Sequence, residues 1–152
     1  MNKLKLSYLL ICIPFISYGQ CSDDESELII DIQFDIWSSE NSYSISENSQ
    51  EIHFVNFNNN NLQNYQFSIC LSSGNYQFTM YDSWGDGQGS NWTNNYDNGN
   101  ISLSLDGESI FYDSGNWGYQ TNHSFVINNI IYGCLDTDAS NYNPDANYDD
   151  NS

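Results

Sequence analysis

The chain has 152 residues, with 20 Asp and Glu against 2 Lys and Arg, and a formal net charge of −18. Both lysines lie among the first five residues, so removal of an N-terminal leader takes the formal charge to −20. Such a surface excludes nucleic acid and anionic membrane as partners, because both bind mainly through basic side chains. An aromatic content of 16% distinguishes the chain from disordered acidic segments, which lack the apolar side chains of a folded core.

Residues 1–20 have the composition of a secretory signal peptide. A start that carries both lysines precedes an apolar run at residues 6–17, which is too short to span a bilayer, and Ser17-Tyr18-Gly19 is a small-x-small exit site. The alternative is a lipid anchor on Cys21, which Gln20 immediately before it disfavours. We predict a protein that is secreted or held at the cell surface after cleavage.

Residues 21–130 are predicted to form one β-sandwich domain. Apolar residues alternate with polar ones in short segments that turn-forming residues separate. The hairpin signal Asp106-Gly107 is the strongest of these turns. No window has a helical period, so the expected fold class is all-β, an antiparallel β-sandwich of jelly-roll-like or CUB-like form. The predicted strands lie within residues 28–36, 43–45, 52–57, 65–71, 76–80, 101–105, 110–112 and 125–127.

The segment at residues 81–100 joins two predicted strands and concentrates acidic residues and glycines without any Lys or Arg. Its glycines at 85, 87 and 89 are expected to take positive φ and to fold the loop tightly, so that carboxylates and carbonyl oxygens converge. Converging oxygens repel one another unless a cation binds them, and Ca²⁺ accepts six to eight oxygen ligands in loose geometry. We predict a calcium site with the ligands Asp82, Asp86, Asp97 and, from a distant turn, Glu40.

This loop is not an EF-hand. Trp84 and Thr93 stand at positions 3 and 12 of that motif, where it requires ligands. An alternative without metal stays open, because Asp and Gly also form ordinary turns in loops that bind no ion.

Aromatic residues in the loops support a second hypothesis, which is carbohydrate binding. Planar rings in segments of low apolar content stack on sugar faces, while Asn and Asp side chains accept hydrogen bonds from hydroxyls. The competing interpretation is that these rings cover the ends of a small core. The rings concerned are Trp84, Trp92, Trp117 and Tyr119.

The sequence gives little support to an enzymatic function. His53 and His123 lie in or beside strand patterns without a nucleophile motif, and no cluster of histidines is present to bind catalytic zinc. We therefore expect a non-catalytic protein.

Three cysteines follow the predicted leader, namely Cys21, Cys70 and Cys134, and secreted proteins usually pair their cysteines. A disulfide between Cys21 and Cys70 is one interpretation. The other leaves Cys70 buried and unpaired at a strand end.

Residues 131–152 differ in composition from the predicted sandwich, since they carry many carboxylates and amides and no strand pattern. The carboxylates form a weaker second set of candidate metal ligands: Asp136, Asp138, Asp145, Asp149 and Asp150. The segment GCLDTDASNYNPDANYDDNS resembles the short acidic Cys-flanked repeat of bacterial secreted proteins, of the form GCtDp-a-NYnp-A--DDGSC. Asn151 replaces the glycine of that repeat. The resemblance implies a closing cysteine just after Ser152 and hence a fragment of a longer protein; the alternative is a complete protein with a free Cys134.

The motif Asp82-Ser83-Trp84-Gly85-Asp86-Gly87, with Cys70-Leu71 before it and Asp106-Gly107 after it, carries a second resemblance. It resembles the D-S-[YFW]-G-D-G module of secreted multidomain peptidases and adhesins from bacteria with C-terminal sorting signals, over about residues 27–128. Related modules place a Cys where this chain has Asn75, and a Trp or Cys where it has Gln88, so a loop disulfide is absent here. The resemblance implies an accessory, non-catalytic β domain with bound calcium, and it does not supply a ligand. Besides the divalent cation, the partners that we predict are a polysaccharide or a cell-surface protein.

Overall fold

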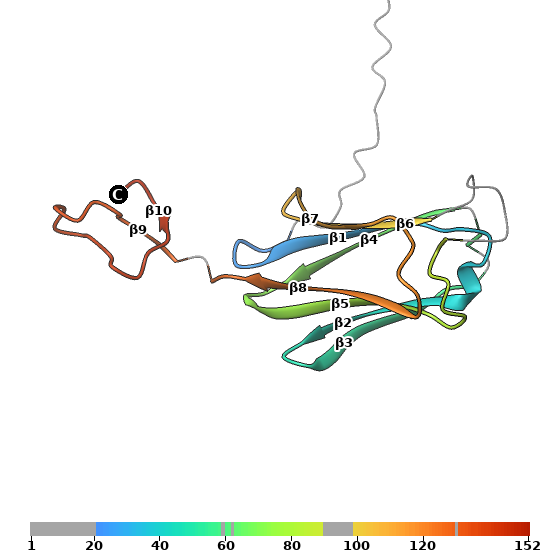
Figure 1. The fold of residues 1–152 in the computed structure, drawn as a ribbon. Coiled ribbons are helices and arrows are strands. Elements are labelled where there is room, and N and C mark those ends of the chain that lie inside the picture. The colour runs from blue at the N-terminus through green and yellow to red at the C-terminus, as the bar shows by residue number, and fades with distance from the viewer. Residues whose placement is uncertain (1–20, 59, 62, 90–98, 130) are drawn as a thin grey trace, which may run out of the picture.

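The computed structural model describes residues 21–58, 60–61, 63–89, 99–129 and 131–152. Eight strands form two four-stranded sheets in the orders β4-β1-β6-β7 and β3-β2-β5-β8, in which all neighbours are antiparallel (Figure 1). This arrangement confirms the predicted antiparallel β-sandwich. The strands are β1 (Ser26–Gln33), β2 (Asn41–Glu47), β3 (Gln50–Asn56), β4 (Asn64–Leu71), β5 (Gly74–Asp82), β6 (Asn100–Leu105), β7 (Glu108–Asp113) and β8 (Gln120–Ile127), with a 3-10 helix η1 (Ser38–Glu40) before β2.

The connections wind the chain from one sheet to the other. Only β2–β3 and β6–β7 are hairpins within one sheet, and every other connection between consecutive strands of the sandwich crosses to the opposite sheet. This is the winding of a double-sheet jelly roll. The β5–β6 connection is one of these crossings and contains most of the acidic segment at residues 81–100, called the acidic loop below.

Alternation of side chains along each strand builds the core. In β1, Leu28, Ile30 and Ile32 are buried between the sheets, whereas Glu27 and Asp31 face outward. Tyr43, Phe78, Met80 and Leu103 are among the fully buried residues that the other strands contribute. The inward-facing positions along the strands thus follow the alternation predicted from the sequence.

The two histidines close the open edges of the sandwich. His53 on edge strand β3 stacks on Phe67 of β4 with ring centroids 4.6 Å apart, and His123 on β8 stacks on Phe111 of β7 at 5.0 Å. Each imidazole therefore bridges the two sheets and serves as a packing group.

Two tight turns fix the hairpin registers. Asp106 and Gly107 have φ of 50° and 84°, as the predicted turn requires, and Asn48 and Ser49 take φ of 48° and 69° between β2 and β3. The Asp106 carboxylate also accepts a hydrogen bond from the Glu27 amide at 2.8 Å. The β6–β7 turn is thereby tied to β1.

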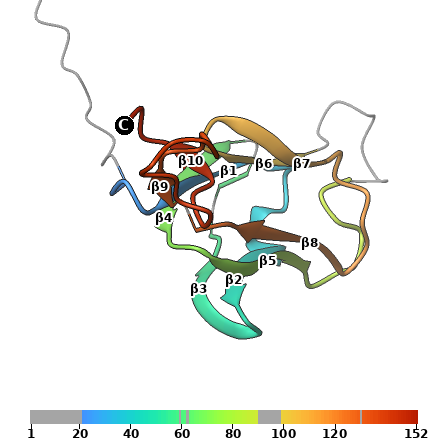
Figure 2. The same ribbon diagram turned by 90° about the vertical axis from the view of Figure 1, so that its left-hand side faces the viewer.

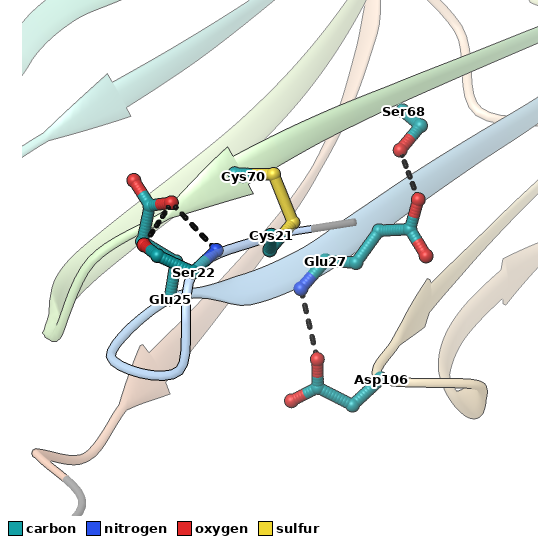
Figure 3. Close-up of a disulfide and its surroundings, with 7 residues drawn as sticks. All are labelled: Cys21, Ser22, Glu25, Glu27, Ser68, Cys70 and Asp106. Atoms are coloured by element: carbon teal, nitrogen blue, oxygen red, sulfur yellow. Dashed lines mark hydrogen bonds between the residues drawn. A yellow bond between two sulfur atoms is a disulfide. The ribbon is translucent and has the colours of Figure 1, made fainter. Parts of the chain in front are cut away.

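A disulfide joins Cys21 to Cys70, with Cα atoms 5.4 Å apart, and fastens the chain before β1 to the end of β4 (Figure 3). The predicted pairing is confirmed, and the alternative of an unpaired Cys70 is wrong. The bridge also uses the sulfur that a lipid anchor on Cys21 would need. Crosslinks of this kind stabilise a domain by about 2–4 kcal/mol, chiefly by restricting the unfolded chain.

Residues 131–152 form a small unit of their own after β8. The two-residue strands β9 (Tyr132–Gly133) and β10 (Tyr148–Asp149) pair in parallel, and the rings of Tyr132 and Tyr148 meet edge to face. The expectation of no strand in this segment is therefore wrong at these residues, because the backbone closes on itself after an irregular turn. Asn151 has φ of 59°, the left-handed conformation that suits the glycine of the resembled repeat.

The C-terminal unit and the acidic loop lie at opposite ends of the sandwich (Figure 1). Figure 2 views the molecule from the end that carries β9 and β10. Within the described part of the chain, no helix has the length and apolar character needed to cross a membrane. The predicted leader at residues 1–20 lies outside the described residues.

Candidate metal centre

Three segments meet at the end of the sandwich away from the C-terminal unit (Figure 1): η1, the loop after β5, and the turn before β8. Backbone hydrogen bonds hold them together. The amide of Ser83 donates to the carbonyl of Glu40 at 3.0 Å, and the amide of Asp82 donates to the carbonyl of Tyr119 at 2.9 Å. Because β2 and β5 are neighbours, Asn41 is the cross-strand partner of Asp82. The sheet therefore sets the position of Asp82, and the hydrogen bond to Ser83 ties Glu40 to the loop.

The structure brings together three of the four predicted calcium ligands. Glu40, Asp82 and Asp86 each offer one carboxylate oxygen, and these oxygens all lie within 4.8 Å of one another. They form the only such group of three or more His, Cys, Asp or Glu residues in the part of the chain that the structure describes. Asp97, the fourth predicted ligand, lies outside the described residues.

Asp82 is only 3% exposed and uses its two oxygens differently. Its Oδ1 accepts hydrogen bonds from the backbone amides of Trp84, at 2.7 Å, and Gly85. Its Oδ2 is buried and has no hydrogen-bond partner, and the same holds for Oδ1 of Asp86. Buried oxygens of native proteins normally have partners, so two orphaned carboxylate oxygens in one group are the arrangement that a bound cation would satisfy.

Asn41, which was not predicted from the sequence, carries another unpartnered buried oxygen next to this group. The side chain is 2% exposed; its Nδ2 donates to the carbonyl of Trp37 at 3.3 Å, while its Oδ1 has no partner. Asn41 follows Glu40 and is paired with Asp82 across the sheet, so the amide oxygen lies on the inward side with Asp82. A neutral amide oxygen is a common calcium ligand beside carboxylates.

The electrostatics of the group favour a cation. Desolvation raises the pKa of Glu40, and the charges of Asp82, Asp86 and Asp35 raise it further. Desolvation also raises the pKa of Asp82, against the opposing effect of the amides of Gly85 and Trp84. No Lys or Arg follows residue 5, so no basic side chain of the described chain can neutralise the group.

Two glycines allow the loop to pack against the turn before β8. Gly85 has φ of 82° and lies under the ring of Tyr119, where a Cβ would be 2.5 Å from the Tyr119 Cζ. Gly87 has φ of 69°, and a Cβ there would be 2.4 Å from the carbonyl oxygen of Gly115. Gly89 does not have the positive φ predicted for it. The tight folding of the loop thus depends on the first two glycines.

Exposed aromatic residues occur in the segments that carry the group. Of the rings proposed for carbohydrate binding, Trp84 and Tyr119 are 75% and 69% exposed, whereas Trp117 packs against the core. Trp92 lies outside the described residues. Trp37, which the sequence analysis did not select, is 50% exposed just before η1.

The carboxylates of the C-terminal unit do not form a comparable group, since no three of them place oxygens within 4.8 Å of one another. Several instead accept hydrogen bonds from backbone amides two residues later. The amides of Asp138, Asn151 and Ser152 donate to Asp136, Asp149 and Asp150 respectively. These side chains act as turn formers.

Comparison with known proteins does not assign the chain to a family. No protein-family model matches the chain, and no curated protein matches it.

Proposed function

We propose that this chain is a non-catalytic calcium-binding accessory or adhesion module of a protein that is secreted or held at the cell surface. The observation that carries the proposal is the group of buried, unpartnered oxygens on Asp82 and Asp86, with Glu40 beside them. A cation bound there would give these oxygens the partner that the described residues do not provide.

The donor set favours calcium over other divalent ions. All the available ligands are hard oxygens, from the three carboxylates and the Asn41 amide. Zinc sites in proteins rely on His and Cys ligands, and magnesium requires near-ideal octahedral geometry. Calcium accepts oxygens in irregular arrangements, so it suits a set drawn from η1, β2 and the loop after β5.

Two further features support the extracellular and non-catalytic parts of the proposal. The Cys21–Cys70 disulfide is compatible with an oxidising compartment, where the predicted leader would direct the chain. Both histidine rings are packed between the sheets and have no described carboxylate partner, which favours structural roles for them.

We expect calcium to raise the thermal stability of the protein without its leader. With an affinity of about 10⁻⁴ M, typical of extracellular modules, several millimolar calcium would stabilise the native state by about 2 kcal/mol. A domain of this size would then melt roughly 5–10 °C higher in calcium than in EDTA. Calorimetry or circular dichroism at matched ionic strength measures this shift.

Sodium chloride and magnesium are the controls, because any salt screens the self-repulsion of so acidic a chain. An equal shift with magnesium or with sodium chloride alone would contradict a calcium site. So would the absence of saturable calcium binding in isothermal titration calorimetry.

A further inference from the structure

The exposed rings at the metal centre belong to the same short segments as its ligands. Trp84 lies between Asp82 and Asp86, and its amide donates to Asp82. Tyr119 accepts a hydrogen bond from the Asp82 amide through its carbonyl, and its ring covers Gly85. The carbonyl of Trp37 accepts hydrogen bonds from the Glu40 amide and from Asn41. An ion in the carboxylate group would therefore be held by segments that also carry three exposed aromatic side chains.

The described protein side chains do not fill the coordination shell of a calcium ion, so an external molecule can also bind to it. Calcium takes six to eight oxygens. The described side chains of the site are three carboxylates, with the Asn41 amide next to them, and one oxygen of Asp82 is already used by two backbone amides. Glu40 and Asp86 are only half-buried, so the ion would face solvent on their side. Positions that the chain leaves open are filled by water, and hydroxyl groups of a ligand can replace that water.

The negative charge of the chain restricts the kinds of molecule that can bind at this site. The chain beyond residue 5 contains 20 Asp and Glu and no Lys or Arg, so its field repels acidic polysaccharides, acidic peptides and nucleic acid. Three carboxylates around a divalent ion still leave a net negative site. An uncharged ligand with neighbouring hydroxyls meets no such repulsion, and the C–H faces of its sugar rings suit exposed indole and phenol rings.

We propose that the metal centre is a calcium-dependent binding site for neutral glycans. Neighbouring sugar hydroxyls complete the coordination of the ion, and Trp84, Tyr119 and Trp37 contact the sugar faces. This inference rests on the proposed calcium site and adds to it the chemical class of the ligand.

Affinity electrophoresis of the protein without its leader tests the inference, with gels that contain mannan, laminarin or xyloglucan, each in calcium and in EDTA. We expect at least one of these neutral polysaccharides to retard the protein in calcium and to do so at least about tenfold more weakly in EDTA. Trp84→Ala should weaken the retardation by about tenfold, because truncation of a central aromatic contact typically has that effect. Its calcium affinity, measured by calorimetry, should stay unchanged.

Tyr112→Ala is the matched control, because Tyr112 is 63% exposed on β7, which belongs to the other sheet. It should bind as the wild type does. If calcium binds but no neutral polysaccharide retards the protein, the glycan inference is overturned and the calcium site stands. Retardation that is unchanged by EDTA or by Trp84→Ala also overturns it. So does retardation that occurs only with polygalacturonate, which is an acidic polysaccharide. If calcium does not bind, both proposals fail.

Discussion

Replacement of Asp82 by Asn is expected to raise the melting temperature in EDTA and to lower it in calcium. The amide retains an oxygen that can accept the hydrogen bonds of the Trp84 and Gly85 amides, so the loop keeps its fold. The substitution replaces only the unpartnered Oδ2, and the neutral amide nitrogen that takes its place lies beside Asp86 and Glu40. Without metal, one of three crowded charges disappears, which should stabilise the protein by about 1 kcal/mol. With calcium, the variant should lose most of the roughly 2 kcal/mol that the ion contributes to the wild type.

The pH dependence of the metal-free protein provides a second measure of the same effect. Burial raises the pKa of Asp82 and of Glu40 in the folded state. A carboxyl group with a raised folded-state pKa favours folding while it is protonated, so its contribution is present below the unfolded pKa of about 4 and is lost as the pH rises through the folded value. In EDTA, the wild type should therefore lose stability from about pH 4 towards neutrality, and Asp82→Asn should lose less.

Two variants separate the metal site from general charge effects. Asp24→Asn removes one charge from an exposed position before β1 and should give the same small shift in both media. Asp82→Ala removes the acceptor for Trp84 and Gly85 as well, so it should lower stability with and without calcium. If Asp82→Asn behaves like Asp24→Asn under both conditions, Asp82 does not bind the ion. Denaturant unfolding in EDTA and in calcium measures each free energy of unfolding.

The sandwich could be predicted from the sequence because its strands follow a strict two-residue period. The same period contains information about the site that the sequence analysis did not use. Asp82 continues the inward series of Phe78 and Met80, and Asn41 begins the inward series of Tyr43, so both polar residues occupy core positions at strand ends. A polar residue at an inward position is costly unless a partner is supplied, so an interruption of this kind at a strand end is a usable signal of a binding site.

The meeting of Glu40 with the acidic loop could be proposed from the sequence, but local patterns were insufficient to establish it. It depends on the pairing of β2 with β5, two strands that β3 and β4 separate in the chain. Local patterns do not specify which strands become neighbours, since non-local pairing is decided by the packing of the whole sandwich. For the same reason the sequence did not reveal that the carbonyls of Trp37 and Tyr119 anchor this group.

Replacement of Gly87 by Ala is expected to have the largest effect on the loop, because two penalties combine there. Alanine in the left-handed region costs about 1 kcal/mol. Its Cβ would also lie 2.4 Å from the carbonyl oxygen of Gly115, which already accepts a hydrogen bond from the Gln88 amide at 2.7 Å. The neighbouring group is backbone and cannot rotate away, so the loop and the turn before β8 must separate. We expect a total loss of about 3 kcal/mol in the free energy of unfolding.

Gly107→Ala is the matched control, since Gly107 has φ of 84° but no atom within 4 Å of the position that a Cβ would take. It should lose only the conformational part, about 1 kcal/mol, and should keep the calcium affinity of the wild type. Gly87→Ala should bind calcium at least about tenfold more weakly, because Asp86 is its direct neighbour and moves with the loop. Equal losses of stability in the two variants would show that the contact with Gly115 does not hold the loop. Normal calcium affinity in Gly87→Ala would show that the position of Asp86 does not depend on that contact.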